Sequence, residues 1–244
     1  MTRPPFLKAQ WRHLAMVSYE VDRTALVGLV PRGTELDDWQ GNTYLSVVAF
    51  LFLDTRVLGL PIPFHRDFEE VNLRFYVRRR TAEGWRRAVV FVKELVPRAA
   101  IAWVARALYN ENYSAVPMGH ELRRSADGSQ RIESVSYRWR AADRQNRLFL
   151  SVASDPRPAL SGSLEEFIAE HYWGYSVQRD GGTCEYRAEH SPWRVAPAAD
   201  VELDCDVRRV YGDKLGTFLQ GQPVSAFLAD GSDVTVSHGG RLVG

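Results

Sequence analysis

β-Strand patterns separated by turn signals run along most of this chain, and they restrict its fold more than any other feature. Residues 44–53 (YLSVVAFLFL) form an almost continuous apolar run, which is typical of a strand buried on both faces. Residues 71–77 alternate between apolar and polar side chains, and residues 85–96 are again rich in β-forming residues. Turn signals follow these and later runs, at residues 81–84, 127–128, 180–181, 231–233 and 238–240. The pattern predicts a coiled antiparallel sheet or barrel.

Fewer segments carry a helical pattern. Residues 97–112 begin with a proline, which suits a first helical turn, and they carry one apolar stripe. Residues 163–173 open with a capping box formed by Ser163 and Glu166. A short helix is expected within residues 22–30. We therefore expect about three helices and assign the fold class α+β, with mostly β structure.

No linker, internal repeat or low-complexity tract interrupts the 244 residues, so we expect one domain over residues 1–244. The net charge of +1 favours neither nucleic acid nor an anionic membrane as a partner, and no apolar run has the length of a membrane span. The first ten residues carry no signal-peptide pattern, and the two cysteines form no disulfide framework. We expect reduced thiols and a cytoplasmic location.

No cofactor and no metal site are predicted. The sequence contains no phosphate-binding loop, no dinucleotide-binding glycine pattern and no nucleophile elbow, and its six histidines lack the spacing of a helical metal site. His65 follows a proline-containing turn, which makes it a candidate for the edge of a pocket, or a plain loop residue. His171 lies on the apolar stripe of its expected helix and is interpreted as a core or helix-end residue.

Residues 70–77 carry the most functional information. Successive side chains of a strand point to opposite faces, so Glu70, Asn72, Arg74 and Tyr76 share one face while apolar residues occupy the other. This row offers an acid, an amide, a cation and a phenol, a set that suits a carboxylate or carbonyl ligand. The alternative is an ordinary solvated face of a sheet.

Lys93 and Glu94 interrupt the apolar run at residues 89–96. Simple alternation places Lys93 on the face of Phe91 and Leu95, and Glu94 on the other face. A lysine among apolar neighbours has a lowered pKa and forms a Schiff base readily. The alternative is a lysine whose aliphatic stem packs while its amine reaches water.

A longer series of residues, in order, points to a family. It consists of Trp11, Pro31, Gly33, Glu35, Leu36, Asp37, Gly41, Phe68, Glu70, Asn72, Arg74, Tyr76, Val77, Ala105, Arg106, Tyr109, Tyr113 and Met118. The spaced part at residues 68–77 is the most specific. The series covers about residues 11–240 and resembles the YqjF-like family of uncharacterised conserved proteins (domain of unknown function 2071). Members of that family share the fold of acetoacetate decarboxylase, so the resemblance implies a sheet that closes into a cone around a pocket.

The resemblance also implies roles for individual residues. In the decarboxylase an acidic residue on a comparable strand borders the active site, which makes Glu70 a candidate acid/base and turns its row towards a cavity. Arg74 or Arg106 would anchor an anion. Candidate hydrogen-bond donors to the ligand are Tyr76, Tyr109 and Tyr113. The decarboxylase forms its Schiff base through a Pro-Lys-Lys segment, and the corresponding residues 113–118 contain the proline but neither lysine.

Three functions therefore remain open. The first is an enzyme that acts on a small carbonyl or carboxylate metabolite, and the second is a non-catalytic binding module that uses the same pocket. The third is a protein-interaction domain. The expected partner is a small organic molecule, anionic or carbonyl-bearing, with no nucleic acid and no membrane, and homo-oligomer formation stays open. Decarboxylation through a Schiff base is disfavoured because the lysine segment is missing.

Overall fold

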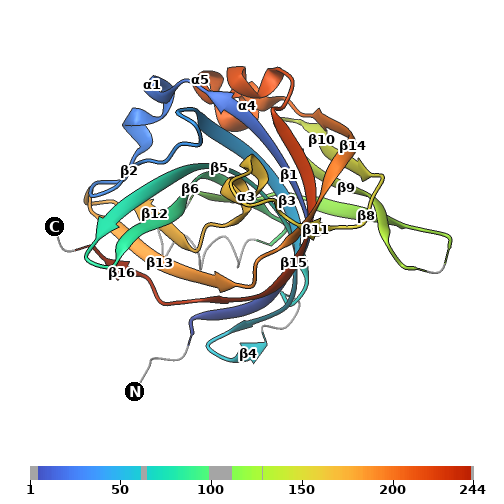
Figure 1. Cartoon of the computed structure of the whole chain (residues 1–244), viewed down its shortest axis with the longest axis horizontal. Coiled ribbons are helices and arrows are strands. Elements are labelled where there is room, and N and C mark those ends of the chain that lie inside the picture. The colour runs from blue at the N-terminus through green and yellow to red at the C-terminus, as the bar shows by residue number, and fades with distance from the viewer. Residues whose placement is uncertain (1–4, 62–64, 99–111, 128, 243–244) are drawn as a thin grey trace.

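A single coiled sheet organises the computed structural model, which describes residues 5–61, 65–98, 112–127 and 129–242 (Figure 1). Its long strands are β1 (Leu7–Val21), β3 (Thr43–Val57), β5 (Phe68–Thr81), β6 (Gly84–Val96), β9 (Ile132–Ala141), β10 (Arg144–Val152), β14 (Arg194–Asp204) and β15 (Ser225–Val236). Its shorter strands are β2 (Glu35–Leu36), β4 (Leu60–Pro61), β7 (Tyr113–Ala115), β8 (Met118–Arg124), β11 (Arg157–Pro158), β12 (Trp173–Val177), β13 (Thr183–His190) and β16 (Gly240–Arg241).

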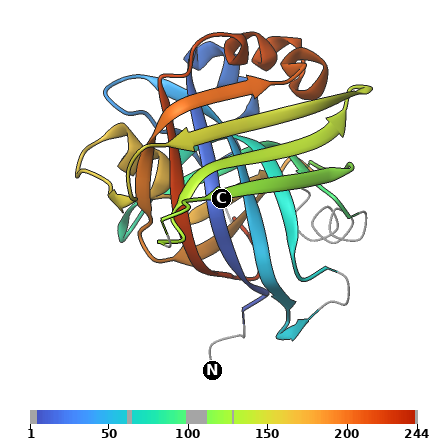
Figure 2. The ribbon, with the colours of Figure 1, turned by 90° about the vertical axis from the view of Figure 1, so that its right-hand side faces the viewer.

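Part of the sheet closes on itself. Among the described residues, the neighbours run β13-β12-β6-β5-β3-β1-β15, and the end of β13 pairs back onto β15. Every pairing in this ring is antiparallel except the parallel pair of β12 and β6. From β15 the sheet continues through β14, β10 and β9 to β8, and these strands cross over the outside of β1 and β3 (Figure 2). The predicted coiled, closing antiparallel sheet is confirmed.

Strands β3 and β5 lie between two apolar layers, which explains why their sequences carry so few exposed polar positions. The first ten residues of β3 are all buried. Val47, Ala49 and Leu51 pack towards the outer strands β9 and β10, while Val48 and Phe50 face the interior of the ring. Alternate residues of one strand thus serve two cores.

The helices are short. They are α1 (Arg23–Leu26), α3 (Leu164–Ala169), α4 (Val207–Tyr211) and α5 (Asp213–Gly216), with 3-10 turns at η1 (Val27–Leu29) and η2 (Thr217–Gln220). The predicted cap of α3 is confirmed, because Ser163 Oγ accepts a hydrogen bond from the Glu166 amide at 3.2 Å. The helix ends at Ala169, earlier than predicted, so His171 follows it.

One predicted helix lies largely outside the described residues, and two observed helices were not predicted. The expected helix at residues 97–112 falls almost entirely outside the described residues. Helices α4 and α5 were not predicted, because four or five residues are too few to show a helical period. In the described part of the chain, no helix combines the length and the apolar character that crossing a bilayer requires.

The predicted turn at residues 231–233 is wrong. Gly231 lies inside the continuous strand β15, opposite Arg12 of β1, with a φ of +81°. A Cβ atom at this position would lie 2.0 Å from the carbonyl oxygen of Trp11. Glycine is therefore required here both for its left-handed backbone and for the close approach of β15 to β1.

Replacing Gly231 with alanine tests this requirement. We expect Gly231→Ala to lower the free energy of unfolding by roughly 3 kcal/mol or more, because backbone strain and a backbone clash add together. Gly59→Ala is the matched control, since Gly59 has a φ of +83° but its Cβ would meet nothing within 4 Å. We expect Gly59→Ala to lower the free energy of unfolding by about 1 kcal/mol, because it adds backbone strain without a clash. Urea unfolding of both variants measures the difference, and equal losses would contradict the close-approach account.

Candidate functional site

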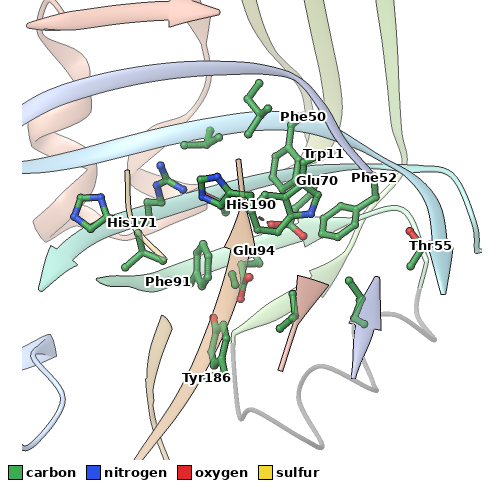
Figure 3. Close-up of a pocket in the computed structure, with 18 of the residues that line it drawn as sticks. Trp11, Phe50, Phe52, Thr55, Glu70, Phe91, Glu94, His171, Tyr186 and His190 are labelled. Carbon is green, nitrogen blue, oxygen red and sulfur yellow. Dashed lines mark hydrogen bonds between the residues drawn. The ribbon is translucent and has the colours of Figure 1, made fainter. Parts of the chain in front are cut away.

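The ring of strands encloses a cavity of about 240 Å³, bounded by side chains of β1, β3, β5, β6 and β13 (Figure 3). Most of its wall is apolar and aromatic. The rings that line it include Trp11, Phe50, Phe52, Phe91, Tyr186 and Trp193. Polar side chains of β5, β6 and β7 reach this cavity, namely Glu70, Asn72, Arg74, Glu94 and Tyr113, and further polar lining comes from Thr55, His65, His171 and His190. An apolar chamber with a few convergent polar groups is the usual form of a small-molecule site.

The row on β5 faces this cavity and not solvent. Glu70 is 3% exposed, Asn72 1% and Arg74 7%, which excludes the solvated-face alternative. Tyr76 is also buried, but it lies beyond the cavity wall, where its hydroxyl is hydrogen-bonded to Ser46 Oγ at 2.6 Å. The period-2 pattern therefore predicted the face correctly, and three of its four polar residues line the cavity.

Glu70 sits among hydrogen-bond donors inside an apolar wall. Asn72 Nδ2 donates to Glu70 Oε1 at 2.9 Å, and the Tyr113 hydroxyl donates to Oε2 at 3.3 Å. Burial raises the pKa of Glu70 to about 7, although these two hydrogen bonds and the charge of Arg74 act in the opposite direction. A carboxyl group with this pKa exchanges its proton near neutral pH, as a general acid or base must.

Arg74 is a buried cation that has no carboxylate partner in the described part of the chain. One of its terminal nitrogens donates to the Ile168 carbonyl of α3 at 3.1 Å, and its guanidinium lies 5.7 Å from the centre of the Tyr76 ring. Its Nε is buried and has no hydrogen-bond partner, and no carboxylate among the described residues lies within ion-pair distance. Burying an unpaired charge is costly, so an anion in the cavity would be strongly favoured.

A β-bulge decides which side chains of β6 reach the cavity. Arg74 of β5 lies opposite Phe91, but the preceding residue, Leu73, lies opposite Lys93, so Val92 is the extra residue. The bulge places Phe91 and Glu94 on the cavity face and Lys93 on the other face, where its Nζ donates to the Val210 carbonyl of α4 at 3.0 Å. The prediction that Lys93 shares the face of Phe91 is therefore wrong.

His171 lines one end of the cavity (Figure 3), close enough to Arg74 for the charge of the arginine to act on its pKa. Burial lowers its pKa to about 4, against the opposing effect of Asp37, so the imidazole is neutral at pH 7. Its Nε2 lies 3.9 Å from Asp37 Oδ2, and neither ring nitrogen has a hydrogen-bond partner in the described structure. Asp37 in turn accepts from Arg87 Nε at 2.7 Å. A neutral, buried histidine offers a ligand one donor and one acceptor.

The remaining predicted residues are distributed as follows. His65 lines the cavity, as proposed for a residue at its edge, and Tyr113 lines it beside Glu70. Arg106 and Tyr109 lie outside the described residues. The residues that the structure describes contain no cluster of His, Cys, Asp and Glu side chains arranged to hold a metal ion.

Sequence reasoning missed three residues at the site. Glu94 is 1% exposed and lines the cavity, but the bulge that turns it inward has no sequence signature. His171 was interpreted as a core residue, and it is buried, yet it also borders the cavity. Trp11 appeared only as part of the family series. Its Nε1 is buried in the cavity wall without a hydrogen-bond partner.

Comparison with known proteins gives matches at two levels. The model of family DUF2071, described as "Uncharacterized conserved protein", matches residues 8–233. Uncharacterized protein YqjF of Bacillus subtilis strain 168 is 28% identical over 200 residues, which are 81% of this chain and 78% of that protein.

Solved structures match over nearly the whole chain. Acetoacetate decarboxylase from Legionella pneumophila superposes with a TM-score of 0.66 at 12% identity, over 98% of this chain and 88% of the decarboxylase. The enduracididine biosynthesis enzyme MppR, in complex with pyruvate, gives 0.67 at 14% identity, over 100% and 92% of the two chains. An acetoacetate decarboxylase-like enzyme from Sphingomonas wittichii gives 0.67 at 14% identity, over 99% and 94%. These likenesses confirm the predicted acetoacetate decarboxylase-like fold.

The raised pKa of Glu70 predicts how stability changes with pH. The folded-state pKa of about 7 lies above the ordinary value of 4.5, so the group contributes most to stability at low pH and loses this contribution as pH rises through 7. We expect Glu70→Gln to gain about 3 kcal/mol of unfolding free energy relative to the wild type between pH 5 and pH 8. Urea unfolding at several pH values measures this difference.

Glu202→Gln serves as the control for this experiment. Glu202 is a half-exposed carboxylate on β14 that pairs with Arg147, and such surface pairs contribute little to stability. Its stability difference from the wild type should stay constant over the same pH range. The account of Glu70 is wrong if the two variants behave alike.

Proposed function

We propose that this chain, which belongs to the DUF2071 family, binds a small organic molecule through a carboxylate or carbonyl group in the cavity beside Glu70, Asn72 and Arg74. The family match over residues 8–233 confirms the resemblance predicted from the sequence. The observation that carries the proposal is the burial of Arg74 in the cavity wall without a carboxylate partner in the described structure. A ligand anion would supply the missing counter-charge.

Several polar atoms around Arg74 support the same ligand position. Asn72 Oδ1, Arg74 Nε and both ring nitrogens of His171 are buried without hydrogen-bond partners among the residues that the structure describes. Buried polar groups that stay unpaired cost free energy, so their presence in the lining of one cavity favours a polar ligand group there. The solved complex of MppR with pyruvate is a precedent for a small oxo acid bound by a protein of this fold.

A second candidate function is catalysis of proton transfer, with Glu70 as the acid/base. The specific observation in its favour is the pKa of Glu70, which burial raises to about 7. With a carbonyl ligand polarised by Arg74, an ionised Glu70 would accept a proton from the adjacent carbon, and the protonated carboxyl would return one. The hydrogen bonds from Asn72 and Tyr113 fix the orientation of the carboxyl group for this exchange.

The position of the lysines argues against imine chemistry at this site. The chain has three lysines, Lys8, Lys93 and Lys214, and none of them is among the residues that line the cavity. Lys93 points away from it because of the bulge at Val92. The third open function, a protein-interaction domain without a ligand, loses support because a cavity lies beside Glu70 where such a domain would have a filled core.

The binding proposal is tested by calorimetric titration with pyruvate, acetoacetate, hexanoate and 3-phenylpropanoate. At least one of these acids should bind, and Arg74→Met should weaken its binding by about tenfold or more, because a charged hydrogen bond is lost. Arg138→Met is the control, since Arg138 lies on the outer strand β9 and pairs with exposed Glu121. It should leave the affinity unchanged.

The outcome that contradicts the proposal is a folded wild-type protein that binds none of the four acids. If Arg74→Met and Arg138→Met lose the same amount of ligand affinity, Arg74 has no specific role in binding. If Arg74→Met proves unfolded by circular dichroism, Arg74→Lys replaces it. Lysine keeps the charge but lacks the planar fork of donors, so an intermediate affinity is expected.

Reductive trapping tests the absence of an imine. The protein is incubated with acetoacetate and sodium borohydride, and its intact mass is measured against a denatured sample that reports background alkylation. We expect no adduct above that background, because the amine of Lys93 donates to the Val210 carbonyl on the far side of the sheet. A stable adduct that maps to Lys93 in the folded protein alone would contradict this placement and revive Schiff-base chemistry.

A further inference from the structure

We infer that the ligand is a monocarboxylic acid that carries a planar aromatic ring. This inference rests on the proposed function, because it assigns the carboxylate to Arg74 and asks what fills the rest of the cavity. Apart from its few polar groups, the lining is mostly apolar, with aromatic rings from β1, β3, β6 and β13, and Figure 3 shows Trp11, Phe50 and Phe52 close to Glu70.

The size of the cavity suits a ring with a short acid chain. Its volume is about 240 Å³, whereas an apolar cavity of about 150 Å³ already accommodates benzene. A three- or four-carbon oxo acid would reach Arg74 and leave the aromatic wall without contacts. Filling that wall with apolar surface contributes binding free energy in proportion to the area buried.

The charges of the lining favour a single carboxylate. Arg74 is the one arginine or lysine among the described lining residues, and His171 is neutral at pH 7. Two carboxyl groups, Glu70 and Glu94, line the same cavity. A second carboxylate on the ligand would be buried with no second cation among the described lining residues to pair with it, and burying an unpaired charge is costly.

The aromatic walls are held in fixed positions, which favours a rigid, planar partner over a flexible chain. Trp11 packs edge-on against Phe50 at 5.4 Å and against Phe52 at 5.7 Å, and it lies 6.1 Å from Trp193. His190 stacks on the other side of this group, 4.2 Å from the Trp193 ring. Edge-on and offset contacts with such rings contribute more binding free energy when the ligand group is itself an aromatic ring than when it is an aliphatic group of the same size.

A glycine shapes a further part of the wall. Gly174 of β12 is paired with Tyr186 of β13, and a Cβ atom on Gly174 would lie 2.2 Å from Tyr186 Cζ. The tyrosine ring therefore occupies the space that the Cβ of any other residue at position 174 would fill. The absence of a side chain on Gly174 thus allows the Tyr186 ring to take its place in the cavity wall on the side of β13.

The test compares matched ligands on the wild-type chain by isothermal titration calorimetry at pH 6.5. The reference ligand is 3-phenylpropanoate. Its partners are 3-cyclohexylpropanoate, which replaces the planar ring, 3-phenylpropan-1-ol, which removes the charge, phenylsuccinate, which adds a second carboxylate, and pyruvate, which lacks the ring.

We expect 3-phenylpropanoate to bind most tightly. The cyclohexyl acid should bind about fivefold more weakly, because ring contacts are lost. The alcohol and the dicarboxylate should each bind at least about tenfold more weakly, since the alcohol lacks the charge that pairs with Arg74 and the dicarboxylate buries a second charge without a cation. Pyruvate should be the weakest of the acids with one carboxylate.

The outcomes separate this inference from the proposed function. If pyruvate binds as tightly as 3-phenylpropanoate and Arg74→Met weakens both, the proposed function stands and the aromatic ligand is wrong. If 3-cyclohexylpropanoate binds as tightly as 3-phenylpropanoate, the inference of a planar ring is wrong. If phenylsuccinate binds as tightly as 3-phenylpropanoate, the inference of a single carboxylate is wrong. If the alcohol matches the acid, or if no compound binds to the folded protein, both the inference and the proposed function fail.

Discussion

Burial of Arg74 is the constraint around which the site is arranged. Strand β5 lies between two apolar layers, so any polar residue on it must find partners inside the protein. Arg74 donates a hydrogen bond to a carbonyl of α3 and lies over the ring of Tyr76, but it forms no ion pair with a carboxylate among the described residues. Glu70, on the same strand and the same face, is in the opposite situation, because burial favours its neutral form. The cavity thus presents a fixed positive charge beside a carboxyl group that gains or loses a proton near neutral pH.

The bulge at Val92 determines the chemistry that these groups can support. Without the extra residue, regular alternation would turn Lys93 towards Phe91 and the cavity. With it, Glu94 takes that side, and the lysine amine is fixed against α4. The chain shares its fold with acetoacetate decarboxylase. Among the described residues, its cavity is lined by two carboxyl groups and one guanidinium, and by none of the chain's three lysines. Such a set is suited to the anion binding and proton transfer that we propose, and it offers no amine for an imine.

Period-2 patterns were sufficient to predict β3, β5 and β6 and to place the four polar residues of β5 on one face, whereas the closed sheet around a pocket was expected from the turn signals and the family resemblance. They succeeded because β3 and β5 are long and uninterrupted, so that each side chain's face follows from its position alone. Prediction failed where one residue breaks the period. Val92 shifts the register of β6, and Gly231 continues a strand where its sequence neighbours suggest a turn. The choice between a solvated and a buried face for Glu70 depended on residues far away in the sequence, such as Trp11, which alternation within one strand cannot reveal.

The most direct test of this account is a crystal structure of the protein soaked with 3-phenylpropanoate at neutral pH. We predict that the carboxylate of the acid lies within about 3 Å of the Arg74 guanidinium, with its ring among Trp11, Phe50 and Phe91. A structure in which Arg74 instead pairs with Glu70 or Glu94, and the acid is bound elsewhere or not at all, would contradict the claim that Arg74 binds the carboxylate of a ligand.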